Sequence, residues 1–214
     1  MKPILFNTEM VRAILEGRKT VTRRVIKLPK RVQEQENGLY TLYTEGTVYE
    51  NFCIEQIVDY ISPYQVNDIL YVRETWCKLP VSEYGNLYTA GEGVYYYKAD
   101  GEKRPQGWRG NWKPSIHMPK EAARLFLRVT GVSVKKLRDM ELEDFIKEGI
   151  ILSREDMKNH DTALYKAREL FKDLWNSTAG KPYSPERYAN SWIGNPYVWV
   201  IEFEVITAEQ AQGK

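Results

Sequence analysis

Short runs of β-branched and aromatic residues recur along this chain of 214 residues and restrict its fold more than any other feature. Each run has the length and composition of a β-strand, and turn residues separate the runs. The clearest runs are Leu39–Tyr43, Thr47–Ile54, Ile69–Trp76, Gly93–Lys98, Ala123–Val134 and Tyr197–Ile206. Many short strands with few helices are typical of a small barrel, so we expect an α+β fold dominated by β-structure.

Three segments have the apolar spacing of helices instead. In the first, Asn7 is a suitable N-terminal cap, and Gly17 suits the position after the last turn. Asp139 can cap a second helix that ends at Gly149. A third helix should cover about residues 162–176. We therefore expect about three helices that flank the barrel.

The chain has the length of one domain, which we expect over residues 1–206, with a flexible tail over 207–214. Residues 177–196 contain three prolines and should form a long loop. No stretch approaches the roughly 20 apolar residues of a membrane helix, and the first residues turn polar too early for a secretory signal. We expect a cytoplasmic protein.

The cysteines do not suggest a metal site. Cys53 and Cys77 are far apart and form no short ligand pair. Even with His117 and His160 the spacing would be irregular, so neither a metal nor another cofactor is expected. Two isolated thiols suit a reducing compartment better than a disulfide framework.

Basic residues are concentrated near the N-terminus. Residues 1–30 hold eight Lys and Arg against two Glu, a local net charge of +6 in a chain whose total is +2. Four of these cations lie in the segment 18–24, which we expect to be a polar loop or an extended segment. Such a cluster suits a partner that carries phosphate, and a solvated basic surface is the alternative.

The segment Gly17-Arg-Lys19-Thr-Val-Thr22-Arg-Arg24 resembles the N-terminal signature of the ASCH domain family, especially its longer bacterial and phage or prophage members. Further stretches resemble the same subgroup in order and spacing. They are Val72–Trp76, Trp112–Pro119, Leu127–Thr130, Leu137–Asp139, Ile146–Gly149 and Asn195–Phe203. The chain departs from the pattern at Asn67-Asp68, where many members have Gly-Asp, and at Thr22, where many have Glu.

This resemblance implies a PUA-like barrel with a cleft that is suspected of binding RNA. Relative to a minimal ASCH domain, the insertions would be about residues 31–62, 78–120 and 177–196. Some small members hydrolyse N(4)-acetylcytidine to cytidine and acetate with a lysine, a threonine and a glutamate, and another member is described as a ribonuclease. Lys19 and Thr22 fall on the first two positions of that triad, and Glu148 matches the third.

The triad has residue types that amide hydrolysis requires: a nucleophile, a base and a proton donor for the leaving amine. Thr22 has a hydroxyl, and neighbouring arginines would lower the pKa of Lys19 toward that of a base. Glu148 opposes the dipole at the end of its helix, so helix formation does not account for it. The alternative is that Lys19 and Thr22 are solvated loop residues and that Glu148 is an ordinary surface residue.

Seven further residues could hold the substrate. They are Arg18, Arg23, Arg24, Arg73, Glu74, Trp76 and Trp112. The arginines could bind phosphate or a base edge, and the tryptophans could stack on a base. Arg73 and Glu74 are neighbours on a strand and point to opposite faces, so at most one of them should face a cleft. Pairing of these two with nearby residues is the alternative, and Trp199 is expected in the core.

These observations favour a cofactor-independent hydrolase that removes an acyl group from a modified cytidine-like base such as N(4)-acetylcytidine. An RNA-binding module without catalysis and a metal-dependent ribonuclease are the alternatives. The partner would be a modified nucleoside or RNA, and the oligomeric state stays open.

Overall fold

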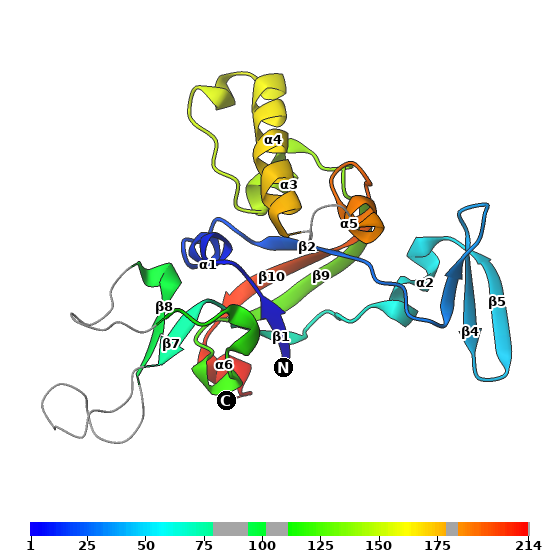
Figure 1. Cartoon of the computed structure of the whole chain (residues 1–214), viewed down its shortest axis with the longest axis horizontal. Helices are drawn as coiled ribbons and strands as arrows, with labels where there is room; N and C mark the ends of the chain where they lie inside the picture. The colour runs from blue at the N-terminus through cyan, green and yellow to red at the C-terminus, as the bar shows by residue number, and fades with distance from the viewer. Residues whose placement is uncertain (79–93, 102–110, 179–183, 214) are drawn as a thin grey trace, which may run out of the picture. The chain divides into compact units, whose positions relative to one another are not determined.

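The computed structural model describes residues 1–78, 94–101, 111–178 and 184–213 (Figure 1). The chain divides into two compact units, each assembled from separate segments of sequence. The first unit consists of Met1–Lys19, Asp68–Arg128 and Glu204–Lys214, and the second of Thr20–Asn67 and Val129–Phe203. The predicted insertions over 78–120 and 177–196, and the predicted strand at 93–98, lie partly outside the described residues.

The first unit contains a small mixed sheet. Strand β1 (Lys2–Leu5) runs parallel to β6 (Ile69–Arg73), and β6 is antiparallel to the first residues of β9 (Phe126–Lys136). Leu70 of β6 is paired with Leu127 of β9, and both side chains are fully buried. Because side chains alternate between the two faces of a strand, this pair marks the face of the sheet that packs into the core. A separate pair is formed by β7 (Trp76–Lys78) and β8 (Tyr95–Tyr97), which are antiparallel.

Helix α1 (Thr8–Leu15) leads directly into the basic motif at residues 17–24. The side chain of Asn7 accepts a hydrogen bond of 2.9 Å from the backbone N–H of Met10, which confirms the predicted cap. Gly17 follows the helix with φ of +72°, a conformation that residues with a Cβ rarely adopt. The helix therefore ends where the sequence predicted, and the chain turns into the motif at this glycine.

The main sheet of the second unit has the order β9-β10-β2, with β2 at Val21–Val25 and β10 at Tyr197–Ile206. Strands β10 and β2 are antiparallel, and their register pairs Trp199 with Arg24 and Ile201 with Thr22. A second sheet has the order β3-β4-β5 and is followed by helix α2. Its elements are β3 (Val32–Glu34), β4 (Tyr40–Thr44), β5 (Thr47–Phe52) and α2 (Ile54–Ile61).

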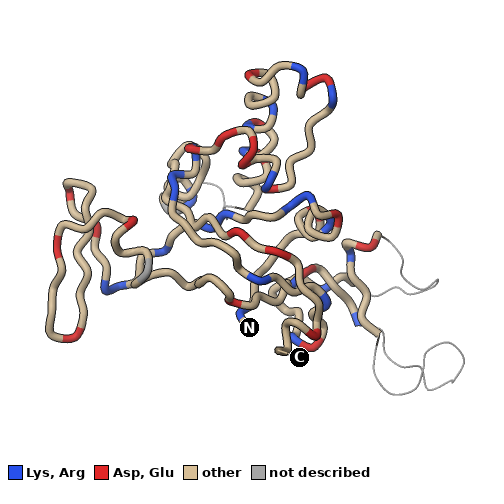
Figure 2. The backbone as a smooth tube through the Cα atoms, turned by 180° about the vertical axis from the view of Figure 1, so that it is seen from behind, with Lys and Arg blue, Asp and Glu red and all other residues tan. Residues whose placement is uncertain are grey.

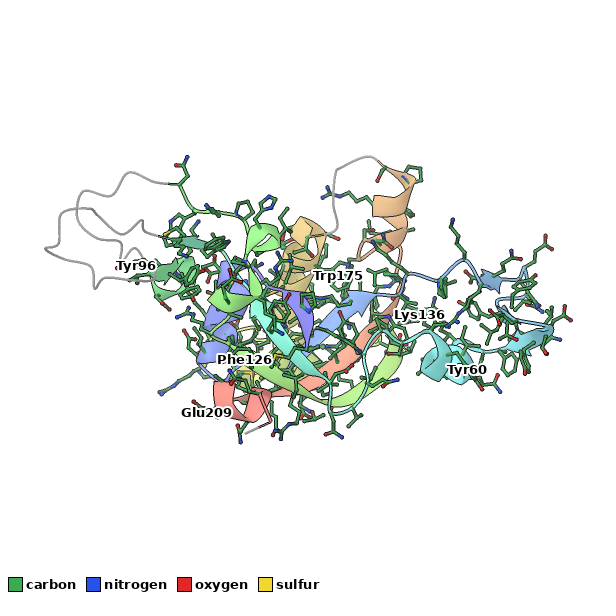
Figure 3. The ribbon with its side chains drawn as sticks, turned by 90° about the horizontal axis from the view of Figure 1, so that it is seen from below. Tyr60, Tyr96, Phe126, Lys136, Trp175 and Glu209 are labelled. Carbon is green, nitrogen blue, oxygen red and sulfur yellow. The ribbon has the colours of Figure 1, made fainter. Side chains whose placement is uncertain are left out.

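Three helices form the rest of the second unit: α3 (Leu142–Lys147), α4 (His160–Thr178) and α5 (Pro185–Asn190). Ala163, Ala167, Phe171 and Trp175 recur every four residues along α4 and are its buried residues. The ring of Phe171 lies 5.5 Å from that of Phe145 and 5.9 Å from that of Trp175 (Figure 3 labels Trp175). This aromatic cluster holds α4 against α3.

The prediction of about three helices is too low. The described residues contain six α-helices, among them α6 (Ala208–Ala211), and short 3₁₀ turns at Lys98–Asp100, Ser115–His117, Lys120–Ala122 and Asp156–Lys158. Helix α5 lies in the predicted loop 177–196, and α6 lies in the predicted flexible tail. Thr207 caps α6, and Ala211 is buried.

None of the sheets that the described strands form closes into a barrel. The fold is therefore a β-rich α+β arrangement, and the described chain does not show the predicted PUA-like barrel. None of the helices in the described ranges is both long and apolar enough to cross a lipid bilayer.

Candidate functional site

The motif was expected to be a polar loop or an extended segment, and the extended alternative is correct from Val21 onward, where strand β2 begins. Val21, Thr22 and Arg23 are all buried in this strand. The backbone N–H of Thr20 donates a hydrogen bond of 2.9 Å to the carbonyl of Lys147, the last residue of α3. Glu148, which follows Lys147, is therefore held beside the beginning of β2.

Polar residues buried in the described parts of the chain form a small set. They are Lys19, Thr22, Arg23, Thr41, Glu74 and Glu148, and each is 5% exposed or less. Five of these six are residues that the sequence singled out as candidates, and only Thr41 is not. Burial of charged and polar groups is costly unless they are paired, so such groups tend to be kept for a structural or functional reason.

Arg23 forms the centre of a buried ionic cluster in the second unit. Its Nη1 donates to Oε1 of Glu148 at 3.0 Å, and its Nη2 donates to Oδ1 of Asp144 at 2.7 Å. The side chain of Arg23 is fully buried, and that of Glu148 is 4% exposed. Both terminal nitrogens of Arg23 are thus used by carboxylates of the α3 region, which suits a residue that positions Glu148.

The Arg23 cluster also affects Asp144. Partial burial acts to raise the pKa of this carboxyl, but Arg23 and the backbone of Glu141 outweigh that effect and lower the pKa below its usual value. Asp144 therefore stays ionised over a wide pH range and keeps Arg23 fixed in place.

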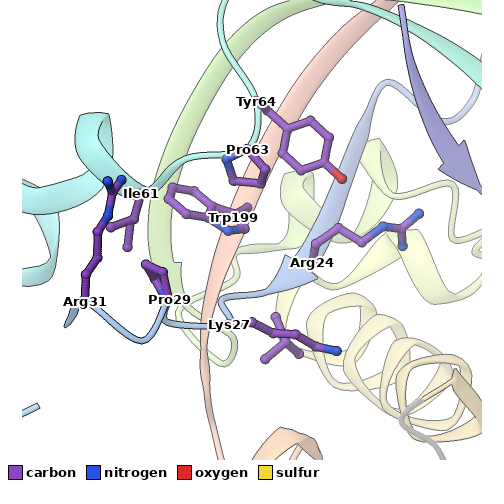
Figure 4. A pocket seen from close by; sticks show the side chains of 9 residues that line it. Arg24, Lys27, Pro29, Arg31, Ile61, Pro63, Tyr64 and Trp199 are labelled. Atoms are coloured by element: carbon purple, nitrogen blue, oxygen red, sulfur yellow. The ribbon is translucent and has the colours of Figure 1, made fainter. Parts of the chain in front are cut away.

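Arg24 lies on the opposite face of β2 from Arg23, because neighbouring side chains on a strand alternate. It lines a cavity of about 420 Å³ together with residues from three other parts of the second unit (Figure 4). The lining residues are Arg24, Val25, Lys27, Pro29, Arg31, Ile61, Pro63, Tyr64 and Trp199. Thr22 shares the face of Arg24, two residues along the strand, so the motif threonine is adjacent to the side of the strand that carries this pocket.

The pocket combines positive charge with aromatic surface. Burial lowers the pKa of Arg24, while Tyr64 and Glu148 act in the opposite direction. A guanidinium nonetheless remains protonated in proteins, so the pocket keeps a partly desolvated cation. Trp199 is 3% exposed and lies between Arg24 and Arg31 in the view of Figure 4. The expectation that Trp199 belongs to the core agrees with its burial, and it also forms part of the pocket wall.

Sequence reasoning selected Arg24 but did not connect it with Arg31, Tyr64 or Trp199. These residues are distant in sequence and come together only through the fold. The pairing of Trp199 with Arg24 follows from the register of β10 on β2, which a single sequence does not reveal.

Lys19 and Arg18 belong to the first unit. Lys19 is 1% exposed, and its Nζ lies 5.9 Å from the centre of the Phe6 ring. Arg18 is close to the surface, and its Nε donates a hydrogen bond of 2.7 Å to Oε2 of Glu16. The burial of Lys19 contradicts the alternative in which this lysine is a solvated loop residue.

Arg73 and Glu74 each have structural partners within the first unit. Arg124 binds both carboxylate oxygens of Glu74, at 3.0 and 3.2 Å. Burial raises the pKa of Glu74 although Arg124 acts to lower it. Nε of Arg73 donates to the carbonyl of Met118 at 2.8 Å, and Nη2 donates to that of Ile116.

Trp76 is packed rather than exposed for stacking. It is 5% exposed, Nζ of Lys113 lies 5.0 Å from its ring centre, and the ring of Tyr95 lies 5.7 Å away. Stacking of a base on this ring would require Lys113 or Tyr95 to move. Trp112 is half-buried in the segment next to Lys113.

The basic cluster of residues 1–30 is largely engaged within the protein (Figure 2 shows the charges along the chain). Five of its eight cations form ion pairs or are buried, namely Lys2, Arg12, Arg18, Lys19 and Arg23. The other three are Arg24, Lys27 and Lys30, and the first two of these line the pocket. Only two of the eight cations in residues 1–30 therefore line the pocket, fewer than the basic sequence suggests.

No group of three or more His, Cys, Asp or Glu side chains that could hold a metal ion occurs among the described residues. Arginine, lysine and aromatic side chains instead dominate the pocket, and these groups recognise anions and planar rings rather than metals.

No family model matches the chain, and comparison with curated proteins and with solved structures also found no significant match.

Proposed function

We propose that this protein is an ASCH-type amidohydrolase of PUA-like ancestry that removes an acyl group from a modified cytidine-like base. The observation that carries the proposal is the burial of all three triad residues, Lys19, Thr22 and Glu148, each 5% exposed or less. A core of this size can be filled with apolar residues, so three buried polar residues at the triad positions favour a chemical role.

In the proposed reaction, the hydroxyl oxygen of Thr22 forms a bond with the acyl carbon of the amide, and the bond from that carbon to the base nitrogen breaks. Lys19 takes the hydroxyl proton, because burial favours the neutral amine that a base requires. The Glu148 carboxylate relays the proton that Lys19 has taken to the leaving nitrogen, so that both groups return to their starting states. The oxygen of a water molecule then forms a bond with the acyl carbon, the ester bond to Thr22 breaks, and one water proton returns to the Thr22 oxygen as the carboxylic acid leaves.

The pocket beside β2 supports this assignment. The half-buried Tyr64 offers aromatic surface for a pyrimidine ring, with the buried Trp199 forming the wall beside it, and Arg24 offers hydrogen-bond donors for the carbonyl oxygen of that ring. Glu148 pairs with Arg23, which points to the face of β2 opposite to Thr22, but it also acts on the charge of Arg24, which shares the face of Thr22. The proposal therefore requires the Glu148 carboxylate to reach the substrate from the edge of β2.

Incubation with N(4)-acetylcytidine, followed by chromatography of the released cytidine, tests the proposal. We expect release by the wild-type protein and a loss of roughly 10²-fold or more in Thr22→Val, which keeps the side-chain shape but removes the hydroxyl. Thr22→Ser should keep part of the activity. Glu148→Gln should be impaired, whereas Glu143→Gln, on the exposed side of the same helix, should not be.

Circular dichroism of each variant verifies that the fold is retained. Absence of cytidine release by the wild-type protein, or full activity of a folded Thr22→Val variant, would show that the amidohydrolase assignment is wrong.

The second candidate is an RNA-binding module without catalysis, and the cations of the pocket favour it. In that case Glu148→Gln leaves RNA affinity unchanged and no acylated nucleoside is hydrolysed. The metal-dependent ribonuclease gains no support from the described residues, since none of their acidic, His or Cys side chains form a metal-binding group.

A further inference from the structure

The charge of the pocket exceeds what a free nucleoside requires. Arg24, Lys27 and Arg31 all line it, and no Asp or Glu is among its lining residues. Glu148 acts on the charge of Arg24, so Lys27 and Arg31 are the pocket cations that an anionic ligand would neutralise. A free cytidine has no net charge at neutral pH and would not neutralise them.

The three cations differ in their origin. Arg24 belongs to the ASCH-like motif on β2, while Lys27 and Arg31 come from the connection between β2 and β3, outside the motif. Arg31 is oriented by a hydrogen bond of 2.6 Å from its Nη2 to the carbonyl of Tyr60, next to Ile61 in the pocket wall. Its remaining N–H groups stay available as donors, because a guanidinium has five. The fold therefore holds Arg31 at the pocket.

The rest of the pocket indicates what accompanies the anion. A volume of about 420 Å³ lies within the range of roughly 300–1,000 Å³ that is usual for small-molecule sites. Trp199, Tyr64, Ile61 and two prolines form an apolar and aromatic wall. An inorganic anion alone would leave this wall unused, whereas a base and a sugar would cover it.

We propose that the natural ligand carries a phosphate group, so that it is a nucleotide or a nucleotide unit of RNA and not a free nucleoside. The proposal rests on the proposed function in taking the Arg24 pocket as the site of the base. Lys27 and Arg31 bind the phosphate, and Tyr64 contacts the base against the pocket wall that contains Trp199. The two cations outside the motif would thus determine which form of the substrate is accepted.

Calorimetric titration with cytidine and with cytidine 5′-monophosphate tests the proposal independently of any reaction. We expect the nucleotide to bind at least tenfold more tightly. The double variant Lys27→Ala/Arg31→Ala should bind both compounds equally weakly. Lys30→Ala is the matched control, since Lys30 is an exposed neighbour that does not line the pocket, and it should keep the preference.

Equal affinity of the wild-type protein for cytidine and its monophosphate would overturn the proposal, as would an unchanged preference in the double variant. A third titration with a short oligonucleotide that lacks a terminal phosphate distinguishes the two sources of the group. Tighter binding of the oligonucleotide assigns the site to RNA, and tighter binding of the monophosphate assigns it to a free nucleotide.

Failure of this inference and failure of the proposed function have different signatures. If N(4)-acetylcytidine and its 5′-monophosphate are hydrolysed with equal kcat/KM, the hydrolase assignment holds and the phosphate inference does not. If neither compound is hydrolysed but the monophosphate binds in a Lys27- and Arg31-dependent manner, the phosphate inference holds and the hydrolase assignment does not.

Discussion

Buried charges are the feature that separates this chain from an ordinary α+β protein at the scale of single residues. Arg23 has no exposed side-chain surface and is held by two carboxylates of the α3 region. Removal of one partner from such a cluster leaves a buried charge uncompensated, which is far more damaging than the loss of an exposed ion pair. Arg23 thus makes the position of Glu148 depend on the charge state of Asp144.

We expect Asp144→Asn to lower the free energy of unfolding at pH 7 by about 1.5–3 kcal/mol, the usual contribution of a hydrogen bond to a charged group. The folded-state pKa of Asp144 is depressed below the model-compound value of 3.8, so its stabilisation is present above that pH. It is lost as the pH falls from 3.8 through the lower folded-state pKa. Urea unfolding between pH 2 and 7 measures this.

In the variant, the stability should fall less steeply over the acid range than in the wild type. Asp161→Asn is the control, because Asp161 has a side chain that is 98% exposed. If the free energy of unfolding falls equally steeply with decreasing pH in Asp144→Asn and in the wild type, the assigned ion pair is contradicted.

The sequence could reveal those site residues that lie close together along the chain, but not those that only the fold brings together. Lys19, Thr22 and Arg24 lie within one short motif, and their buried or pocket-lining positions suit a site there. Arg31, Tyr64 and Trp199 carry no signal of their own, because a loop cation and aromatic residues occur throughout the chain. Only the packing of β10 on β2 and the course of the chain after α2 bring them to the pocket.

At the scale of elements, long periodic segments were predictable and short ones were not. Strand β10 covers Tyr197–Ile206 as expected, and α4 covers His160–Thr178 where about 162–176 was expected. Helix α2 was missed because its Ile, Val and Tyr residues have high strand propensity and follow a true strand, β5. Burial of Ile54 and Ile57 against the β3-β4-β5 sheet overrides that propensity.

The connection between α5 and β10 contains a glycine that the packing requires. A Cβ on Gly194 would lie 2.3 Å from the carbonyl oxygen of Tyr188 and 2.4 Å from that of Ala189. Both oxygens belong to the backbone of α5, so rotation of a side chain cannot relieve the clash. We expect Gly194→Ala to destabilise the protein by about 1–3 kcal/mol or more.

Thermal unfolding compares this variant with Gly131→Ala. At Gly131 the added Cβ would meet the Glu202 carboxylate at 3.1 Å, and an exposed, flexible side chain can move away. The Gly194 variant should therefore melt at a clearly lower temperature. Equal melting temperatures would mean that α5 and the connection to β10 are not packed as described.

For the whole molecule, the distribution of charge matters more than its total. The eight cations of residues 1–30 would form a strong site for polyanions if all of them faced solvent, but five are paired or buried. Residues 32–62 contain six acids and no Lys or Arg, which adds an acidic segment directly after the basic one. Long-range attraction of nucleic acid should therefore be weak.

We expect the logarithm of the affinity for a single-stranded RNA to fall with the logarithm of the salt concentration with a slope of about −1.4. This follows from about 0.7 per neutralised phosphate and the two pocket cations that are assigned to phosphate, Lys27 and Arg31. Engagement of all eight N-terminal cations would instead give a slope of about −6. Fluorescence anisotropy of a labelled oligouridylate over a range of KCl concentrations distinguishes the two values.

The division of the first unit among three segments has a consequence for how the protein is made. Its N-terminal segment, which ends at Lys19, is synthesised first, yet the unit is complete only with Glu204–Lys214 and the buried Ala211 of α6. During translation, the contacts of the first unit can therefore form completely only after residues 204–214 have been made.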